Sequence, residues 1–455
     1  MAFASTNPAT GKVVATFDNF SEAQIEAALA ASMSAHKTLK SWSMEDRRAA
    51  MHRIADILED EAESLGAIIT LEMGKTLKSA IGEVKKCVRG CRYYADNASD
   101  IMADEPVKAT DATTYKKYLP LGPIMLVMPW NYPLWQVYRF VGPALMAGNT
   151  GLLKHASNVP QCSLSVEDVV RRAGFPEDAL QSVFVTTDQV GGMLRDDRVR
   201  GATLTGSERA GASVASICGQ EIKPTVLELG GSDAFIVMPS ADIDKAVNVA
   251  VTSRTQNCGQ SCIAGKRFIV HANVYDEFKA KLKAAFEALV VGDPLDPTTD
   301  IGPLVSEGAR SEITKQVENA IKDGAVRVTG GEIIDGTGFF FQPGILENVQ
   351  ITSNAYYEEI FGPVAILFKV SSIEDAVVLA NDSPFGLGSS IFTNNIDEQN
   401  LAISEIEAGA TFVNSMTASH PALPFGGVKR SGYGRELAAE GLRAFCNVKT
   451  VSIAS

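Results

Sequence analysis

The sequence predicts an α/β fold built from two doubly wound parallel sheets, with a small β-arm outside them. Short apolar runs alternate with helical stretches from about residue 122, and a second series of the same kind begins near Ala234. Strands that recur with helices between them favour parallel sheets. The first series of expected strands covers Ile124–Met128, Gly151–Leu153, Val183–Val185, Ala202–Leu204 and Val226–Leu227, and the second covers Ala234–Met238, Phe268–Val270 and Ala365–Phe368.

The first hundred or so residues are expected to be largely helical. Ser21 and Gln24 form a capping-box pattern, and Ser43 precedes the acidic residues of a first helical turn. After the second start, apolar residues from Met51 to Leu58 repeat at helical spacing with charged residues between them. This pattern predicts an amphipathic helix with one buried face.

Two short strands, Thr113–Leu119 and Val448–Ile453, are expected outside both sheets. They would form the β-arm. Such strands either pair with another subunit or join a sheet of their own chain, and the sequence leaves both arrangements open.

Composition restricts the class of protein. The chain has 455 residues, 45% of them hydrophobic and 21% charged, which suits two to four globular domains. A net charge of −13 would repel a phosphate backbone, so nucleic acid is not an expected partner. No secretory signal or membrane-spanning run is recognisable, so we expect a cytoplasmic protein without a membrane partner.

The seven cysteines do not suggest a disulfide framework, because their number is odd and their spacing is wide. The histidines form no pair at metal-ligand spacing near them, so no metal is expected. Cys87 and Cys91 fit small buried residues on a helix. Whether Cys258 and Cys262 form a redox-regulated bond is left open.

Polar or glycine-rich residues follow three of the expected strands, at 129–131, 154–157 and 206–207. Ligands of doubly wound sheets bind beyond the carboxyl ends of the strands. The usual phosphate-binding motifs are missing: Gly74-Lys75-Thr76 lacks the earlier glycine, since Ile69 stands there, and no G-x-G-x-x-G occurs. A dinucleotide would therefore be held differently from the common fingerprint.

Two residues stand out as candidates for chemistry. Cys262 lies in a glycine- and polar-rich turn ahead of a strand, where a thiolate could face a cleft and act as a nucleophile. Glu228 lies between two leucines and before a glycine pair, where loss of water could raise its pKa towards that of a general base. A structural thiol and a salt-bridged glutamate are the alternatives.

The ordered motifs along the chain resemble those of the aldehyde dehydrogenase superfamily. The resemblance runs from Asn7-Pro8-Ala9-Thr10-Gly11 to the last strand, which is essentially the whole chain. The motifs that carry it are Pro-Trp-Asn at 129–131, Glu-Leu-Gly-Gly at 228–231, Gly-Gln-Ser-Cys at 259–262, Glu-Ile-Phe-Gly-Pro at 359–363 and Pro-Phe-Gly-Gly at 424–427.

The resemblance implies an aldehyde dehydrogenase-like fold and an NAD(P)-dependent oxidation of an aldehyde to a carboxylic acid. Cys262 would attack the aldehyde, and the Asn131 amide with the Cys262 N–H would hold the oxyanion. Glu228 would activate the water that hydrolyses the thioester. A CoA-acylating relative would have no use for Glu228, and a catalytically silent scaffold protein would not need Cys262, Asn131 and Glu228 together.

The resemblance also implies a cofactor site and a discontinuous domain plan. Residues 1–110 and 122–228 would bind the dinucleotide, 229–427 would carry the cysteine, and 111–121 with 428–455 would supply oligomerisation strands of a dimer or tetramer. NAD-selective relatives often carry a glutamate where Ser157 stands, so we expect NADP, with NAD as an alternative. The implied cofactor contacts are Trp130, Lys154, Ser157, Gly206, Ser207, Gly211, Glu359 and Phe361.

A last resemblance concerns the substrate. Arg139, among apolar neighbours, needs an anionic partner, which could be structural. Its segment resembles the corresponding helix of succinic semialdehyde dehydrogenases, whose arginine binds the substrate carboxylate; Ser419 matches an assisting serine, and Phe425 belongs to the same expected substrate site. Gln256 replaces a second arginine of some relatives, which leaves glutaric semialdehyde or a broader range of aldehydes open.

Overall fold

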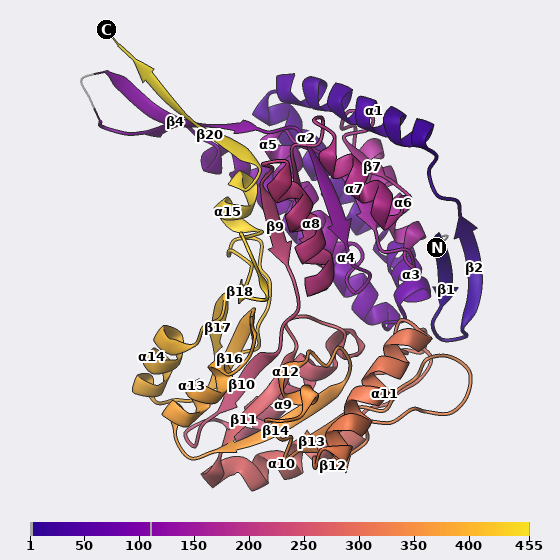
Figure 1. The fold of residues 1–455 in the computed structure, drawn as a ribbon, viewed down its shortest axis with the longest axis vertical. Coiled ribbons are helices and arrows are strands. Elements are labelled where there is room, and N and C mark those ends of the chain that lie inside the picture. Colours follow the sequence, from indigo (N-terminus) through magenta and orange to yellow (C-terminus); the bar gives the residue numbers. More distant parts are fainter. Residues whose placement is uncertain (1–2, 110–111, 455) are drawn as a thin grey trace.

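The structure is a computed structural model that describes residues 3–109 and 112–454. Two α/β units lie one above the other in Figure 1, and a β-arm projects from the upper unit. The upper unit begins with a two-stranded sheet, β1 and β2, and four helices. Their bounds are β1 Phe3–Asn7, β2 Lys12–Phe17, α1 Glu22–Ser41, α2 Met44–Asp60, α3 Ala62–Met73 and α4 Leu77–Ile101.

The upper unit is built on a six-stranded sheet with the order β19-β9-β8-β5-β6-β7. Strands β9 to β7 in this order run parallel, and β19 joins antiparallel to β9. The elements are β5 Pro123–Met128, α5 Trp135–Ala147, β6 Thr150–His155, α6 Pro160–Arg172, β7 Leu180–Ser182, α7 Thr187–Arg195, β8 Gly201–Thr205, α8 Glu208–Gln220, β9 Thr225–Glu228, β19 Gly432–Tyr433 and α15 Ala438–Arg443.

The lower unit is built on a seven-stranded sheet with the order β12-β13-β14-β11-β10-β16-β17, parallel except for β12. Its elements are β10 Asp233–Val237, α9 Ile243–Thr255, the 3₁₀ turn η1 Gln256–Gly259, β11 Gly265–His271, α10 Ala272–Glu287, α11 Glu307–Lys322, β12 Val326–Thr329, β13 Gly344–Glu347, α12 Asn354–Tyr357, β14 Val364–Val370, α13 Ile373–Asn381, β15 Phe385–Gly386, β16 Gly388–Phe392, α14 Ile396–Glu405, β17 Ala410–Val413 and β18 Val428–Lys429.

One expected strand is wrong. Residues 183–185 are buried and apolar but belong to no strand, and β7 ends at Ser182 instead. Strand β7 pairs with β6 from Leu180 to Ser182, and the Val183 N–H still donates to the Leu153 oxygen before the chain leaves the sheet; Val183 and Val185 stay in the core. The other expected strands are confirmed to within a few residues.

Both expected helix starts are confirmed. Ser21 caps α1 and Ser43 caps α2, and each serine accepts the backbone N–H of the third helical residue. The second start is also a full capping box, because the Asp46 carboxylate accepts the Ser43 backbone N–H. The sequence pattern predicted the N-cap serine and the acidic first turn, but not the return bond from Asp46.

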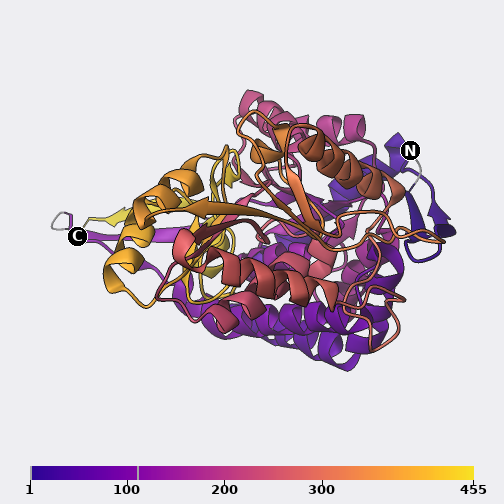
Figure 2. The ribbon, with the colours of Figure 1, turned by 90° about the horizontal axis from the view of Figure 1, so that it is seen from below.

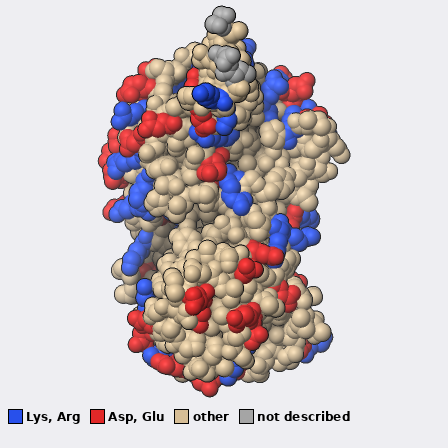
Figure 3. Space-filling view, turned by 90° about the vertical axis from the view of Figure 1, so that its left-hand side faces the viewer, with Lys and Arg blue, Asp and Glu red and all other residues tan. Residues whose placement is uncertain are grey.

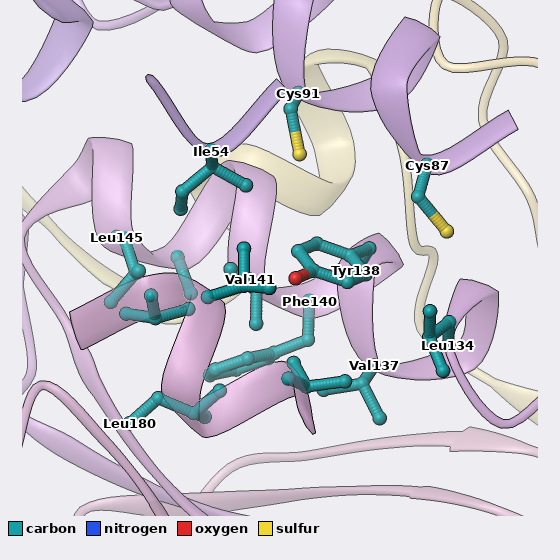
Figure 4. Packing of buried hydrophobic residues seen from close by; sticks show 14 of the residues in the cluster. Ile54, Cys87, Cys91, Leu134, Val137, Tyr138, Phe140, Val141, Leu145 and Leu180 are labelled. Carbon is teal, nitrogen blue, oxygen red and sulfur yellow. The ribbon is translucent and has the colours of Figure 1, made fainter. Parts of the chain in front are cut away.

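The core of the upper unit surrounds α5, all of whose residues are buried. Figure 4 shows Val137, Tyr138 and Val141 of this helix packed near Cys91 of α4 and Ile54 of α2. Cys87 and Cys91 are fully buried, so their interpretation as small core residues is confirmed. The Glu83 carboxylate of α4 accepts the backbone N–H groups of Leu134 and Trp135, which fastens the end of the 129–134 loop to α4.

The expected arm strands pair with each other. Strand β4, Thr113–Pro120, lies between β20, Cys446–Ile453, and the short β3, Glu105–Pro106, in an antiparallel sheet. Figures 1 and 2 show this sheet projecting from the body, far from the N-terminal strands. Between β18 and β20 the chain returns to the upper unit, where α15 packs on α5.

The surface carries charges of both signs. On the face drawn in Figure 3, lysines and arginines are interspersed with aspartates and glutamates, and no large area of one sign is visible. No helix in the described part of the chain is long and apolar enough to span a bilayer. Within residues 3–109 and 112–454, no cluster of His, Cys, Asp and Glu side chains is arranged to hold a metal ion.

Candidate active site

Cys262 lies in the tight turn that links η1 to β11. Asn257 and Cys258 adopt left-handed backbone angles, with φ of 58° and 57°, and Gly259 follows with φ of 74°. At Gly259 a β-carbon would lie 2.4 Å from the backbone of the 362–363 segment, so only glycine fits there. Three successive left-handed residues reverse the chain and present Cys262 at the junction of the two units.

Side-chain amides fasten this turn to the loop that follows β5. The Asn257 amide donates to the backbone oxygens of Asn131, at 2.8 Å, and Gln260, at 2.9 Å. The Asn131 amide also donates to the Gln260 oxygen, at 3.1 Å. An amide nitrogen carries two N–H groups, so the second of Asn131 can serve a further acceptor. Asn131 is therefore held beside the cysteine turn.

The sequence analysis did not single out Lys266, although this residue also binds the cysteine turn. Its buried ammonium donates to the backbone oxygens of Ser261, at 2.9 Å, and Cys262, at 2.8 Å. It also lies 3.1 Å from a carboxylate oxygen of Glu359. One lysine thus couples the cysteine turn to the Glu359 segment. The sequence signal that could have found Lys266 is a charged residue in an apolar strand, four positions after Cys262.

Cys262 lines two pockets, one on each side of it. The larger has a volume of about 230 Å³ and the smaller about 120 Å³. The larger pocket is lined by Pro129, Trp130, Asn131, Thr205, Gly206, Ser207, Leu229, Gly230, Cys262, Glu359 and Phe361. The smaller is lined by Lys86, Tyr132, Trp135, Gln136, Arg139, Gln256, Ser261, Cys262, Ile263, Met416, Thr417, Ala418, Ser419 and Phe425.

The larger pocket lies where the sequence placed a dinucleotide, beyond the carboxyl ends of parallel strands. Ser207 caps α8 by accepting the Ala210 N–H, and Gly206 before it adds no side chain, so the start of α8 borders the pocket, and helix N-termini suit the charge of a pyrophosphate. Trp130 and Phe361, which both line the pocket, pack edge to face with ring centroids 5.7 Å apart. These residues and Glu359 fit a nicotinamide dinucleotide.

Three expected cofactor residues lie outside the walls of this pocket. Lys154 is half-buried on β6, with its ammonium 5.7 Å above the Phe3 ring, and burial lowers its pKa. Ser157 lies three residues further along the same strand exit. Gly211 lies in the first turns of α8, where a β-carbon would come within 2.6 Å of Leu229. Packing against Leu229 therefore accounts for the glycine at 211.

Glu228 ends β9 and is buried, and neither carboxylate oxygen has a hydrogen-bond partner in the described part of the structure. Burial raises the pKa of Glu228 well above its ordinary value. The nearby Glu436 carboxylate raises the pKa further, while the positive charge of Arg139 lowers it. In its deprotonated form, a carboxylate with a raised pKa and free lone pairs is a stronger base and can accept a proton from water.

Arg139 has a structural partner. Its Nε lies 2.8 Å from the Glu436 carboxylate, and its Nη2 donates to the Thr205 hydroxyl at 3.3 Å. The backbones of Glu436 and Phe425 bond to each other reciprocally, which places Glu436 at this point, and the guanidinium stacks 4.7 Å from the Phe425 ring. The structural salt bridge that the sequence left open is therefore present, and Arg139 also lines the smaller pocket.

The Cys262 thiol is protonated in this environment at neutral pH. Burial raises its pKa to about 12, although the positive charges of Arg139 and Lys266 act in the opposite direction. Thiolate is the nucleophilic form, so Cys262 needs a base or a further cation beside it before it reacts. The larger pocket, which would hold a cationic nicotinamide ring, is the place for such a cation.

The smaller pocket gathers Arg139, Ser419 and Phe425 as the sequence implied. It also contains Lys86, a residue of α4 that the sequence did not single out. Lys86 donates to the Ser419 hydroxyl at 2.7 Å, and the Trp135 indole donates to the same hydroxyl at 3.1 Å. The sequence feature that could have indicated Lys86 is its position at the edge of the buried face of α4, next to buried Cys87.

The chain belongs to the aldehyde dehydrogenase family, whose model matches residues 1–451. It is 54% identical to the Mycobacterium tuberculosis (strain H37Rv) protein named succinate-semialdehyde dehydrogenase, NADP(+), 1, with all of both chains covered. The identity is also 54% to the Mycobacterium avium (strain 104) succinate-semialdehyde dehydrogenase, NADP(+), with all of this chain and 97% of that protein covered.

Solved structures agree with this family. The succinic semialdehyde dehydrogenase of Streptococcus pyogenes, solved with NADP+, superposes with a TM-score of 0.98 and is 40% identical, with complete coverage of both chains. The protein Gox0499, solved in a study of cofactor and substrate selection, superposes with a TM-score of 0.99 at 42% identity, again with complete coverage. The expected family and fold are therefore confirmed.

Proposed function

We propose that this chain oxidises succinic semialdehyde to succinate with NADP+ as the acceptor, and that NAD+ is the weaker alternative. The observation that carries the proposal is the position of Cys262 between a pocket for a dinucleotide and a small pocket with two basic side chains. The names of the relatives from two Mycobacterium species and from Streptococcus pyogenes support the same substrate and cofactor.

The proposed chemistry begins with Cys262. Its thiolate adds to the aldehyde carbon, and the oxyanion that forms is held by the Asn131 amide and the Cys262 backbone N–H. Donors of this kind contribute about 3 kcal/mol each to the transition state. The bound oxidised cofactor supplies the hydride acceptor, after which a thioester remains on Cys262. Glu228 then takes a proton from water as that water attacks the thioester, and the acid leaves.

The remaining residues bind the two ligands. We assign the nicotinamide half of the cofactor to Trp130, Glu359 and Phe361, and the carboxylate end of the substrate to Arg139, Ser419 and Phe425. The pyrophosphate falls to Gly206, Ser207 and the first turns of α8 up to Gly211, and the adenosine ribose with its 2′-phosphate to Lys154 and Ser157. The lysine can neutralise that phosphate, and the small serine hydroxyl leaves room for it.

This assignment divides the chain by function. The upper unit binds the dinucleotide, the lower unit carries the nucleophile, and the arm of β4 and β20 joins subunits into a dimer or tetramer in the cytoplasm. The structure of the arm supports the joining of subunits because, among the described residues, β20 pairs on one side only and offers an open strand edge.

A panel of aldehydes assayed with NADP+ and NAD+ tests the proposal. We expect kcat/KM for succinic semialdehyde to exceed that for butanal, which has the same number of carbons and no carboxylate, by at least tenfold. Equal values for the two aldehydes would contradict the substrate assignment, and a preference for NAD+ would contradict the cofactor assignment.

A further inference from the structure

The smaller pocket holds an excess of positive charge. Its lining contains two basic side chains, Lys86 and Arg139, and no acidic one. The two cations differ in what surrounds them. Arg139 is compensated by the buried carboxylate of Glu436, 2.8 Å away, so its charge is already balanced within the protein.

Lys86 has no such balance. No carboxylate in the described part of the chain forms a salt bridge with its ammonium, and its contacts are the Ser419 hydroxyl at 2.7 Å and the face of the Trp135 ring at 4.7 Å. The side chain is half-buried, and burial together with the charge of Arg139 lowers its pKa to about 8. The Glu83 carboxylate acts in the opposite direction, but it is itself paired with Lys75. An unpaired, poorly hydrated cation gains from an anion that enters the pocket.

Ser419 is prepared to assist that anion. Its oxygen accepts from Lys86 and from the Trp135 indole, and these two donors occupy both lone pairs of a hydroxyl. The hydroxyl proton must then point elsewhere, and it is left to donate. The ammonium of Lys86 has three N–H groups, of which Ser419 uses one. Two N–H groups and one O–H group thus remain for the oxygens of a carboxylate.

We propose that Lys86 is the residue that determines specificity for aldehydes with a terminal carboxylate, by binding that carboxylate together with the Ser419 hydroxyl. This proposal rests on the proposed function and adds to it the origin of the charge preference. Arg139 also lines this pocket and keeps its assigned contact with the carboxylate, but Glu436 already balances its charge. The unbalanced charge that selects an anionic substrate is therefore the ammonium of Lys86.

The test compares Lys86→Met with Lys85→Met, which removes the same charge from the neighbouring, exposed position of α4 outside both pockets. Charge-assisted hydrogen bonds typically account for about tenfold to hundredfold in affinity. We expect Lys86→Met to raise KM for succinic semialdehyde by this factor and to leave kcat/KM for butanal within about threefold. Lys85→Met should match the wild type with both aldehydes.

The outcomes separate this proposal from the proposed function. Equal use of butanal and succinic semialdehyde by the wild type would overturn the substrate assignment itself. A wild type that prefers the acid, with a Lys86→Met variant that keeps the preference, would overturn only the role of Lys86. Loss of activity towards both aldehydes would also overturn it, since that would indicate a structural role.

Lys86→Arg provides a second variant that keeps the charge and does not depend on the folding of Lys86→Met. We expect it to retain most of the preference for succinic semialdehyde. Inhibition by succinate in competition with butanal should weaken at least tenfold in Lys86→Met and less than threefold in Lys86→Arg. Equal inhibition of the wild type and both variants would overturn the proposal.

Discussion

The larger pocket beside Cys262 is lined mainly by loops that leave parallel strands of one sheet, whereas the smaller pocket is lined by side chains from several segments that are distant in the sequence. The first offers backbone N–H groups, glycines and a helix N-terminus. The second offers Lys86 from α4, Arg139 from α5 and Ser419 from the segment after β17. Backbone geometry suits a ligand shared by many enzymes, while side chains brought from separate elements can select one substrate.

The largest effect is expected at the residue the two pockets share. Cys262→Ala should abolish aldehyde-dependent reduction of NADP+, because it removes the nucleophile. Glu228→Gln should still give one rapid burst of reduced cofactor and then stall, since only thioester hydrolysis needs the base. Stopped-flow absorbance will show the burst if the enzyme is concentrated enough for one equivalent of reduced cofactor to be detected. Steady turnover in either variant would contradict the division of labour.

The cofactor side of the comparison is tested by Ser157→Glu. A carboxylate at this strand exit would repel the 2′-phosphate of NADP+, and like charges placed together cost several kcal/mol. We expect the ratio of kcat/KM for NADP+ to that for NAD+ to fall by at least tenfold. Ser157→Gln, of similar size without the charge, is the matched control. A ratio that stays constant in both variants would show that Ser157 does not face the cofactor.

The substrate side predicts opposite shifts in pH dependence. Glu228 acts as a base only when deprotonated, so thioester hydrolysis should fall as the pH drops through its raised pKa. Glu436→Gln removes a repelling charge and should move this acidic limb to lower pH. Arg139→Ala removes an attracting charge and should move it to higher pH.

Each shift should amount to about one pH unit, equivalent to about 1.4 kcal/mol. The measurement is the rate of the steady phase after the burst, recorded with butanal so that carboxylate binding does not contribute. Shifts of the same sign in the two variants would show that the charges of Glu436 and Arg139 do not control Glu228. Lys281→Met is the control variant: Lys281 forms exposed ion pairs with Asp244 and Glu277, so its loss should leave the acidic limb where it is in the wild type.

The smallest effects separate two glycines of the cofactor side. At Gly206 a β-carbon would meet no atom closer than 3.7 Å and would add a methyl group to the pocket. Gly206→Ala should therefore weaken NADP+ binding several-fold without loss of stability. At Gly211 a β-carbon would lie 2.6 Å from Leu229, so Gly211→Ala should cost about 1–3 kcal/mol of unfolding free energy.

Calorimetric titration with NADP+ and urea denaturation distinguish the two variants. If Gly211→Ala weakened cofactor binding with unchanged stability, the glycine would be required by the cofactor rather than by packing. If Gly206→Ala instead lowered stability and left the affinity for NADP+ unchanged, Gly206 would not lie against the bound cofactor.

Local patterns were sufficient for much of the fold. The capped starts of α1 and α2, the strands β5, β6, β8 and β9, and the buried cysteines of α4 all follow from side chains close together in sequence. The motif around Cys262 also lies within a few residues. Such features depend on backbone propensity and on one buried face, which a short stretch of sequence contains.

The sequence by itself determined the alternation of strands and helices, the strand exits that form the larger pocket, and the turn that carries Cys262. Tertiary structure decided the end of β7, the pairing of Arg139 with Glu436, and the position of Lys86 beside Ser419. A charge reveals its partner only when distant segments pack together, because burial, not sequence distance, sets which ions must pair and which remain available to a substrate.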